Sequence, residues 1–215
     1  MNFWEFVKDR QEILVFQGWQ HALMVIECVF WAAVIAVAVG ILVYKSPAGS
    51  GIANALSAVG LTIPSFALLG ILIIPFGLGI LPSWVALCFY AVLPILRNAI
   101  VGLAGVDQSL IESARGMGMG RFRTLFRVEL PMAWPVILAG IRVSTQMIMG
   151  IAAIAAYVNG PGLGGLIFSG LAHLGGANAV KEALVATIGI VILALILDGI
   201  LQLIGRITTP RGIRV

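Results

Sequence analysis

Apolar runs long enough to cross a membrane, separated by short polar links, make up most of the chain. A transmembrane helix needs about 20 apolar residues, and such runs cover about residues 22–44, 52–80, 82–104, 132–158 and 183–204. Only 10% of the residues are charged, against roughly 25% in soluble proteins. The sequence therefore predicts an all-α, polytopic membrane protein whose five spans form one transmembrane domain over residues 1–215.

The second run contains Pro64 and Pro75. A membrane helix tolerates proline when neighbouring groups satisfy the freed carbonyls, so one kinked span is expected there. Arg97 and Asn98 mark a membrane interface near the end of the third run. The Gly-rich segment of residues 159–182 is expected to be an irregular loop with one short helix.

The distribution of Lys and Arg predicts the orientation of the spans. With the N-terminus outside and the C-terminus in the cytoplasm, three basic residues (Lys8, Arg10 and Lys181) lie on the outer face and one, Arg142, lies in a span. The other nine of the 13 lie on the inner face, and they are Lys45, Arg97, Arg115, Arg121, Arg123, Arg127, Arg206, Arg211 and Arg214. Positive loops stay in the cytoplasm, so the loop of residues 105–131 is predicted to be cytoplasmic. The first span serves as the insertion signal, and no cleaved signal peptide is expected.

Several classes of function are not supported by the sequence. The basic residues lie in short links and form no stripe, so binding of nucleic acid is not expected. Cys28 and Cys88 lie inside apolar runs without a Cys-x-x-Cys spacing, so neither a disulfide nor a zinc or other metal site is predicted. Clustered His, Cys or carboxylate patterns typical of a membrane enzyme are missing. His21 and His173 are interpreted as surface residues.

The cytoplasmic loop carries its own helix signals. Ser109 and Glu112 have the spacing of a capping box, and Asp107 is an alternative N-cap. Three glycines end this helix after about two turns, and they are Gly116, Gly118 and Gly120. A second helix is expected over residues 121–129, and the Leu130-Pro131 pair should stop it. The glycines follow no strand and no Gly-Lys-Ser/Thr element is present, so neither phosphate nor ATP is expected to bind here.

Topology alone could explain a basic cytoplasmic loop, but the spacing of residues within it is more specific. The loop matches a pattern that reads Glu-Ala-Ala, three residues, Gly, nine residues and Ile-x-Leu-Pro. The matching residues are Glu112, Ala114, Gly118, Leu130 and Pro131, while Ser113 and Val128 depart from the pattern. At these positions the chain resembles the permease subunit of binding-protein-dependent type I ABC importers.

Further motifs resemble the osmoprotectant permeases, which serve glycine betaine, carnitine, choline or proline betaine. They are Thr62-Ile-Pro-Ser-Phe-Ala67, Leu93-Pro-Ile-Leu-Arg-Asn98, Ala139-Gly-Ile-Arg-Val-Ser-Thr145 and Gly160-Pro-Gly-Leu-Gly164. The resemblance covers about residues 20–210 and implies the methionine-permease-like fold with a cytoplasmic coupling helix, in the inner membrane of a prokaryote.

The resemblance also implies partners. Two ATP-binding subunits would hydrolyse ATP with Mg, so the chain itself would have no cofactor and no catalytic residue. Its coupling residues would be Glu112, Ser113, Ala114, Arg115, Gly116 and Gly118, with Leu130 and Pro131 as the hinge. Five spans are too few to enclose a pathway, so a second permease copy or a paralogue is expected.

An extracytoplasmic binding protein would meet the outer loop, including Asn159, Gly160, Gly162 and Gly164. The aromatic residues of the spans are interpreted as lipid contacts. Two alternatives remain open. The first is an importer for an amino acid such as methionine or for another betaine such as ergothioneine, and the second is a stand-alone carrier or channel.

Ionisable residues inside a span are costly and need a reason. Arg142 and Asp198 lie at matching depth, which predicts that they approach each other or a shared polar cluster near the inner gate. A static pair that locks two spans is the alternative. Gln146 could line the same face. Glu27 lies near the outer end of the first run and either reaches the headgroups or faces the pathway.

Overall fold

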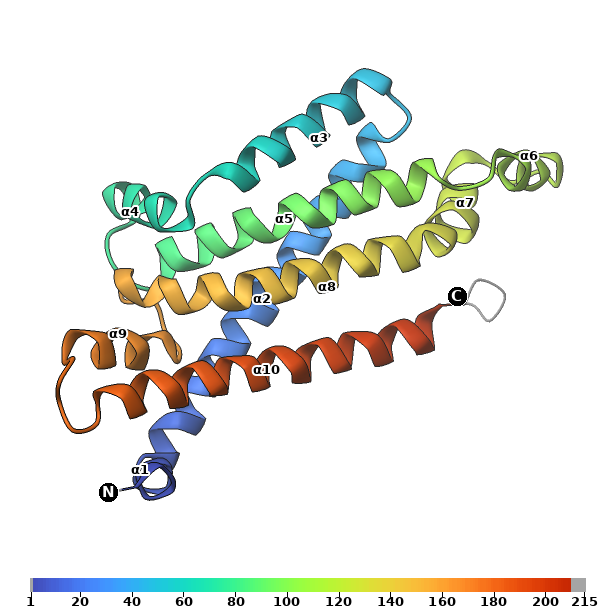
Figure 1. Ribbon diagram of the computed structural model, residues 1–215. Helices are drawn as coiled ribbons and strands as arrows, with labels where there is room; N and C mark the ends of the chain where they lie inside the picture. Colours follow the sequence, from blue (N-terminus) through green and yellow to red (C-terminus); the bar gives the residue numbers. More distant parts are fainter. Residues whose placement is uncertain (1, 210–215) are drawn as a thin grey trace.

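The computed structural model describes residues 2–209, which fold into helices joined by short connections without any strand (Figure 1). The α-helices are α1 (Phe3–Asp9), α2 (Gln11–Val43), α3 (Pro47–Thr62), α4 (Ser65–Phe76), α5 (Ile80–Ala104), α6 (Gln108–Gly116), α7 (Arg121–Thr124), α8 (Leu130–Ile154), α9 (Gly164–Ala172) and α10 (Ala179–Thr208). A π-helix, η1 (Leu125–Glu129), joins α7 to α8, and a 3-10 helix, η2 (Ala155–Val158), follows α8.

Four stretches of the described chain are long and apolar enough to cross a membrane: α2, α5, residues Arg121–Val158 and α10. The pair α3 and α4 makes a fifth candidate span, but its two helices meet at 95°. The predicted second span is thus broken instead of kinked. Ile63, which precedes Pro64, is extended (ψ 126°), as the proline ring requires of its neighbour. The Tyr90 hydroxyl donates a hydrogen bond to the Ile63 carbonyl (2.6 Å) and so satisfies a group that the break exposes.

Helix α5 lies at the centre of the bundle and packs on α2, α3 and α8. Small residues bring these helices close together, as is usual between membrane helices. A Cβ atom added to Gly140 of α8 would lie 2.6 Å from the Cβ of Asn98 on α5, and one added to Gly40 of α2 would lie 3.0 Å from the Cβ of Ala99. Side chains larger than glycine would therefore separate α5 from its neighbours.

Helix α2 begins at Gln11, well before the predicted start of the first span near residue 22. As a consequence His21 lies inside the molecule, where its side chain is fully buried and Nε2 lies 3.2 Å from the Met149 carbonyl oxygen. The interpretation of His21 as a surface residue is wrong. The polar residues that precede His21 do not end the helix, because helix formation needs only a packed face.

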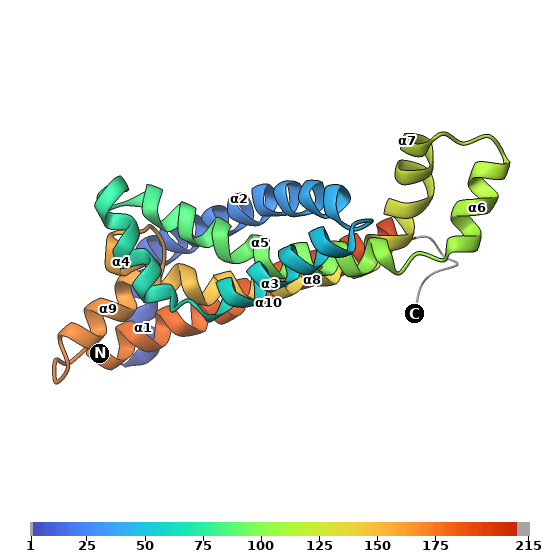
Figure 2. The ribbon, with the colours of Figure 1, turned by 90° about the horizontal axis from the view of Figure 1, so that it is seen from above.

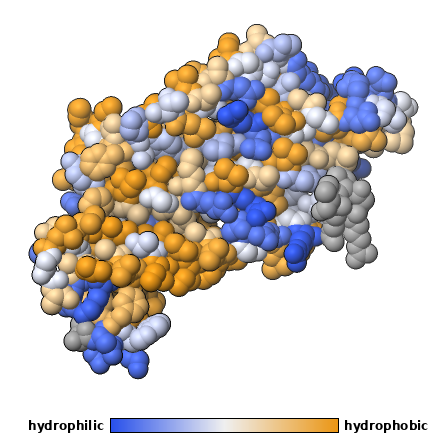
Figure 3. All heavy atoms as spheres, in the orientation of Figure 1, coloured by the Kyte–Doolittle hydropathy of each residue, from blue (hydrophilic) through white to orange (hydrophobic). Residues whose placement is uncertain are grey.

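The two predicted loops lie at opposite ends of the molecule. Helices α6 and α7 project from one end, while α4, α9 and the N-terminus lie at the other (Figures 1 and 2). On the face drawn in Figure 3, hydrophobic residues cover much of the surface between these ends. This arrangement agrees with the orientation derived from Lys and Arg. Arg211 and Arg214, which entered that derivation, lie outside the described residues.

Candidate functional site

Helix α6 is held in place at its start by Asp107. The Asp107 carboxylate accepts a hydrogen bond from the Ser109 backbone N–H (2.9 Å). Hydrogen bonds from the Ser109 backbone and side chain stabilise the ionised form and lower the pKa of Asp107. The N-cap of α6 is therefore Asp107, the alternative that the sequence offered, and not Ser109. The Asp107 side chain binds one of the free N–H groups at the start of the helix.

The two faces of α6 differ in what they touch. Ile111 and Ala114 are buried, and α6 packs on α7 and η1. Of the five predicted coupling residues on α6, four are exposed, and they are Glu112, Ser113, Arg115 and Gly116. Ala114 is the exception, because its side chain lies against its own chain and is only 1% exposed. The helix is therefore a rigid knob whose outer face is free and whose inner face is packed.

The chain leaves α6 through Gly118, whose φ of 80° lies in the left-handed region. Glycine adopts this conformation without the steric cost that a Cβ brings. A Cβ at Gly118 would meet no atom within 4 Å, so the requirement for glycine here is one of backbone conformation and not of space. The tight turn returns the chain to α7 beside α6.

Pro131 does not stop the second helix of the loop, and that prediction is wrong. α7, η1 and α8 form a continuous helical path from Arg121 into the bundle. A proline ring clashes with the carbonyl four residues earlier in a regular α-helix, and the wider π-helical turn of residues 125–129 directly precedes the Leu130-Pro131 pair. Such π-helical turns are frequent at functional sites, and this one joins the projecting knob to a membrane span.

Glu129 is a residue that sequence reasoning missed. Its side chain is 1% exposed and accepts hydrogen bonds from the Tyr44 hydroxyl and from Lys45 Nζ (3.3 Å). Burial and the hydrogen bond to Glu129 raise the pKa of Tyr44. The contact ties η1 to the turn between α2 and α3. More than 80 residues separate the partners along the chain, so no local pattern could have indicated the contact.

Arg142 and Asp198 form the ion pair that their matching depth predicted. Arg142 Nε lies 2.8 Å from Asp198 Oδ1, and the second guanidinium nitrogen lies 3.0 Å from Oδ2. Gln202 adds a hydrogen bond to Oδ2 (2.7 Å), and Gln146 is exposed one turn beyond Arg142. On the face drawn in Figure 3, a hydrophilic patch interrupts the hydrophobic band. A role of this pair in a gate stays a prediction.

Glu27 lies at the midpoint of α2, 16 residues from Gln11 and 16 from Val43. At 1.5 Å per residue this places it about 24 Å from either end of the helix. Its side chain is exposed on the surface of the chain. Helix α2 with its 33 residues is longer than the hydrocarbon core of about 30 Å, so Gln11 does not mark the membrane edge, and the position of Glu27 near the outer end of the span stays a prediction.

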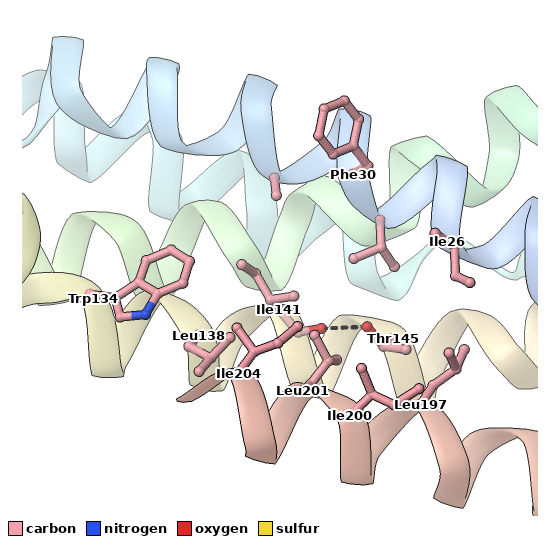
Figure 4. Close-up of a pocket in the computed structure, with 12 residues that line it drawn as sticks. Ile26, Phe30, Trp134, Leu138, Ile141, Thr145, Leu197, Ile200, Leu201 and Ile204 are labelled. Atoms are coloured by element: carbon pink, nitrogen blue, oxygen red, sulfur yellow. Dashed lines mark hydrogen bonds between the residues drawn. The ribbon is translucent and has the colours of Figure 1, made fainter. Parts of the chain in front are cut away.

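A groove of about 440 Å³ runs between α2, α8 and α10 (Figure 4). Its walls are almost wholly apolar, with Ile26 and Phe30 contributed by α2 and Leu197 and Ile200 by α10. The Thr145 hydroxyl in its wall donates a hydrogen bond to the Ile141 carbonyl (2.8 Å). The groove has no charged group with which to bind a cofactor.

The described residues also hold no obvious metal site. Between residues 2 and 209, no three His, Cys, Asp or Glu side chains gather closely enough to hold a metal ion. Cys28 and Cys88 are buried free thiols, and Cys88 Sγ donates a weak hydrogen bond to the Cys28 carbonyl (3.8 Å).

The Gly-rich outer loop is shaped mainly by contacts with its own chain. Gly162 has a φ of 116°, and a Cβ there would lie 2.7 Å from His21 Nδ1. A Cβ at Gly164 would lie 2.0 Å from the Ala153 carbonyl oxygen. Both glycines are buried, Gly160 is half-buried and Asn159 is exposed. The expectation that Gly162 and Gly164 face a binding protein is wrong, because the close packing that requires glycine also covers it.

Comparison with known proteins gives a consistent result. Residues 29–209 match the family described as the binding-protein-dependent transport system inner membrane component. A carnitine transport permease protein of Listeria monocytogenes is 38% identical, covering 97% of this chain and 94% of the relative. A choline transport system permease protein of Bacillus subtilis (strain 168) is 36% identical, covering 98% and 95%. Among solved structures, the MetNI methionine ABC transporter in an inward-facing form matches with a TM-score of 0.74 and 26% identity, covering 96% of this chain and 99% of that one.

Proposed function

The chain belongs to the family of binding-protein-dependent transport system inner membrane components, and from that premise we propose that it is the permease subunit of an ATP-driven osmoprotectant importer. Its substrate is glycine betaine, carnitine, choline or proline betaine. Transport is coupled to separate ATPase subunits through the loop of residues 112–131.

The observation that carries this proposal is the presentation of α6. The helix projects from the end of the molecule assigned to the cytoplasm (Figure 2), its Ile111 and Ala114 are packed inward and its Glu112 and Ser113 face outward. A short rigid helix on a glycine-rich edge can pass on a rigid-body motion of a partner without chemistry of its own. The outer face of α6 is therefore the contact for an ATPase subunit.

Two ATPase subunits, which bind ATP and Mg, and a second permease complete the complex in this proposal. The support for a second permease lies in α10, where exposed apolar side chains follow one another along the helix, and in the exposed part of the Arg142–Asp198 pair. A charged pair at membrane depth is costly when it faces lipid. A second copy or a paralogue would place this face on a shared pathway, where the pair could gate transport.

The substrate class rests on the relatives. The names of three relatives that are 36–38% identical specify carnitine, choline and osmoprotectants, whereas the methionine transporter, at 26% identity, matches mainly in its fold. An amino acid substrate is therefore the weaker candidate. An extracytoplasmic binding protein would deliver the substrate to the outer end, with Asn159 as an accessible contact.

The test is uptake by the complete complex in proteoliposomes. Labelled glycine betaine, carnitine, choline and methionine are offered with the partner ATPase, the binding protein and ATP. ATP-dependent uptake of at least one osmoprotectant is expected. Uptake by this chain without an ATPase would instead identify a stand-alone carrier, and uptake of methionine alone would overturn the substrate class.

A further inference from the structure

Arg97 is a charged residue on α5 that has no hydrogen-bond or ion-pair partner among the residues that the structure describes. Helix α5, a candidate span, continues for seven residues beyond Arg97, to Ala104, so Arg97 lies within a span and not at the inner face, where it was counted for the orientation. Its side chain is exposed, and among residues 2–209 it makes no hydrogen bond or ion pair.

The depth of Arg97 follows from its neighbour. Asn98 lies against Gly140 of α8, where an added Cβ would be 2.6 Å from the Cβ of Asn98. Arg142 follows Gly140 by two residues on α8, so Arg97 and Arg142 lie at similar levels in the bundle. An ionisable residue inside a membrane span is costly unless it has a counter-charge, and it usually marks a functional site.

Asp198, the acidic residue that pairs with Arg142, is not available as the counter-charge. Asp198 binds both nitrogens of Arg142 at 2.8 and 3.0 Å and also accepts a hydrogen bond from Gln202. Glu129 is bound by Tyr44 and Lys45. The counter-charge of Arg97 must therefore come from outside these contacts.

Arg97 lies in the wall of a cleft of about 420 Å³ between α3, α5 and α8. Among the residues that line this cleft, Arg97 is the charged one, and the others are Leu61, Pro94, Asn98, Val101, Val143 and Met147. A small cleft with apolar walls and one well-placed polar group is typical of a site for a small molecule. The Asn98 amide donates to the Pro94 carbonyl (2.9 Å), which holds that side chain along the wall.

We propose that Arg97 binds the carboxylate of zwitterionic substrates as they pass this cleft, a contact that choline, which has no carboxylate, does not make. Guanidinium and carboxylate match as a two-pronged hydrogen-bonded pair. Glycine betaine, proline betaine and carnitine carry a carboxylate beside their quaternary ammonium group, whereas choline carries only a hydroxyl. Val143 and Met147 offer apolar contact for the methylated ammonium. This inference rests on the proposed function, and it identifies the carboxylate as the group of the substrate that the permease itself binds.

The test compares substrates in the assembled complex with saturating binding protein, so that only the permease varies. In the variant Arg97→Gln, uptake of carnitine and glycine betaine should fall about tenfold or more, as expected when a charge-assisted hydrogen bond is lost, while choline uptake keeps at least about half its rate. Arg97→Lys should retain an intermediate rate for carnitine, and Arg97→Glu should favour choline. The control is Lys8→Gln, which removes an exposed cation of α1 at the outer end.

An equal fall for carnitine and choline in Arg97→Gln would overturn the inference, since it would show that Arg97 supports folding or the pairing of permeases. Unchanged carnitine uptake would overturn it as well. If the wild-type complex imports none of these compounds, the proposed function fails first, and the carboxylate site fails with it. The ratio of carnitine to choline uptake thus separates the two claims.

Discussion

Arg142 of α8 and Asp198 of α10 form a two-pronged ion pair, with N–O distances of 2.8 and 3.0 Å. The Arg142 side chain remains 36% exposed and that of Asp198 remains 15% exposed. The pair is therefore open on one side to whatever occupies this face of the molecule. A pair that is both direct and accessible can lock two spans, and it can also respond to a second permease.

Exchange of the two charges tests whether this pairing is required. The single variants Arg142→Asp and Asp198→Arg should each lower ATP-driven uptake at least about tenfold, because each leaves two like charges facing each other. The double exchange should restore a substantial part of the uptake. A double exchange as inactive as either single variant would remove the support for direct pairing as the functional requirement.

Glu112 and Gly118 test coupling. Replacement of Glu112 or Gly118 by Trp should leave membrane insertion intact but separate ATP hydrolysis from uptake, because the outer face of α6 or its exit turn no longer fits the ATPase. The ratio of substrate imported to ATP hydrolysed should fall about tenfold. The control is Gly120→Ala, since Gly120 has an ordinary φ of −67° and no atom near its would-be Cβ. Retention of the normal ratio in the Trp variants would contradict the docking role.

Gly162→Ala should destabilise the outer end of the bundle. The new Cβ would lie 2.7 Å from His21 Nδ1 and 3.1 Å from the His21 Cα, at a φ of 116°. Strain and crowding of this kind cost about 2 kcal/mol, which thermal unfolding in detergent can detect. Gly165→Ala, three residues further on in α9, is the control, since a Cβ there would meet no atom within 4 Å. Equal stability of the two variants would show that the loop is free to move away from His21.

Glu129 and Glu112 should have separable effects. Glu129→Gln replaces a buried carboxylate that two side chains bind, and it should lower the free energy of unfolding by about 1–3 kcal/mol. Glu112→Gln changes an exposed group on α6 and should leave stability unchanged while it weakens coupling. Thermal unfolding measured beside the transport-to-hydrolysis ratio distinguishes them. A loss of stability in Glu112→Gln would show that α6 is held by more than Ile111 and Ala114.

Tyr44 should make stability depend on pH in the alkaline range. Its pKa is raised above the ordinary value of 10.0 by burial and by Glu129, so the folded state keeps a proton that the unfolded state releases. The stabilisation is complete below about pH 10 and is lost as the pH rises further. Between about pH 9 and 11, the wild-type protein should lose more stability than Tyr44→Phe. The exposed Tyr157, replaced by Phe, is the control, and parallel curves for wild type and Tyr44→Phe would refute the expectation.

The sequence by itself determined that the chain lies in a membrane, and it determined the number of candidate spans and the placement of the cytoplasmic loop. These follow from long apolar runs and from the sided distribution of Lys and Arg, which are local properties that any fold of the chain must satisfy. The start of α6 near Asp107, its end at the glycines and the pairing of Arg142 with Asp198 could be predicted for the same reason. Caps are local, and charges at equal depth in lipid have few other partners.

Only the tertiary structure decided which groups the fold covers and which it leaves open. His21 is buried because Gly162 and Met149 lie over it, and Glu129 is buried because Tyr44 and Lys45 reach it from a distant turn. Arg97 remains open because, among residues 2–209, no acidic side chain lines its cleft. Apolar runs specify that helices form and cross the membrane, but the contacts between helices set their rotation and their lateral order. Those contacts are long-range, and they decide which polar residues hold the fold together and which are left to meet a substrate or a partner.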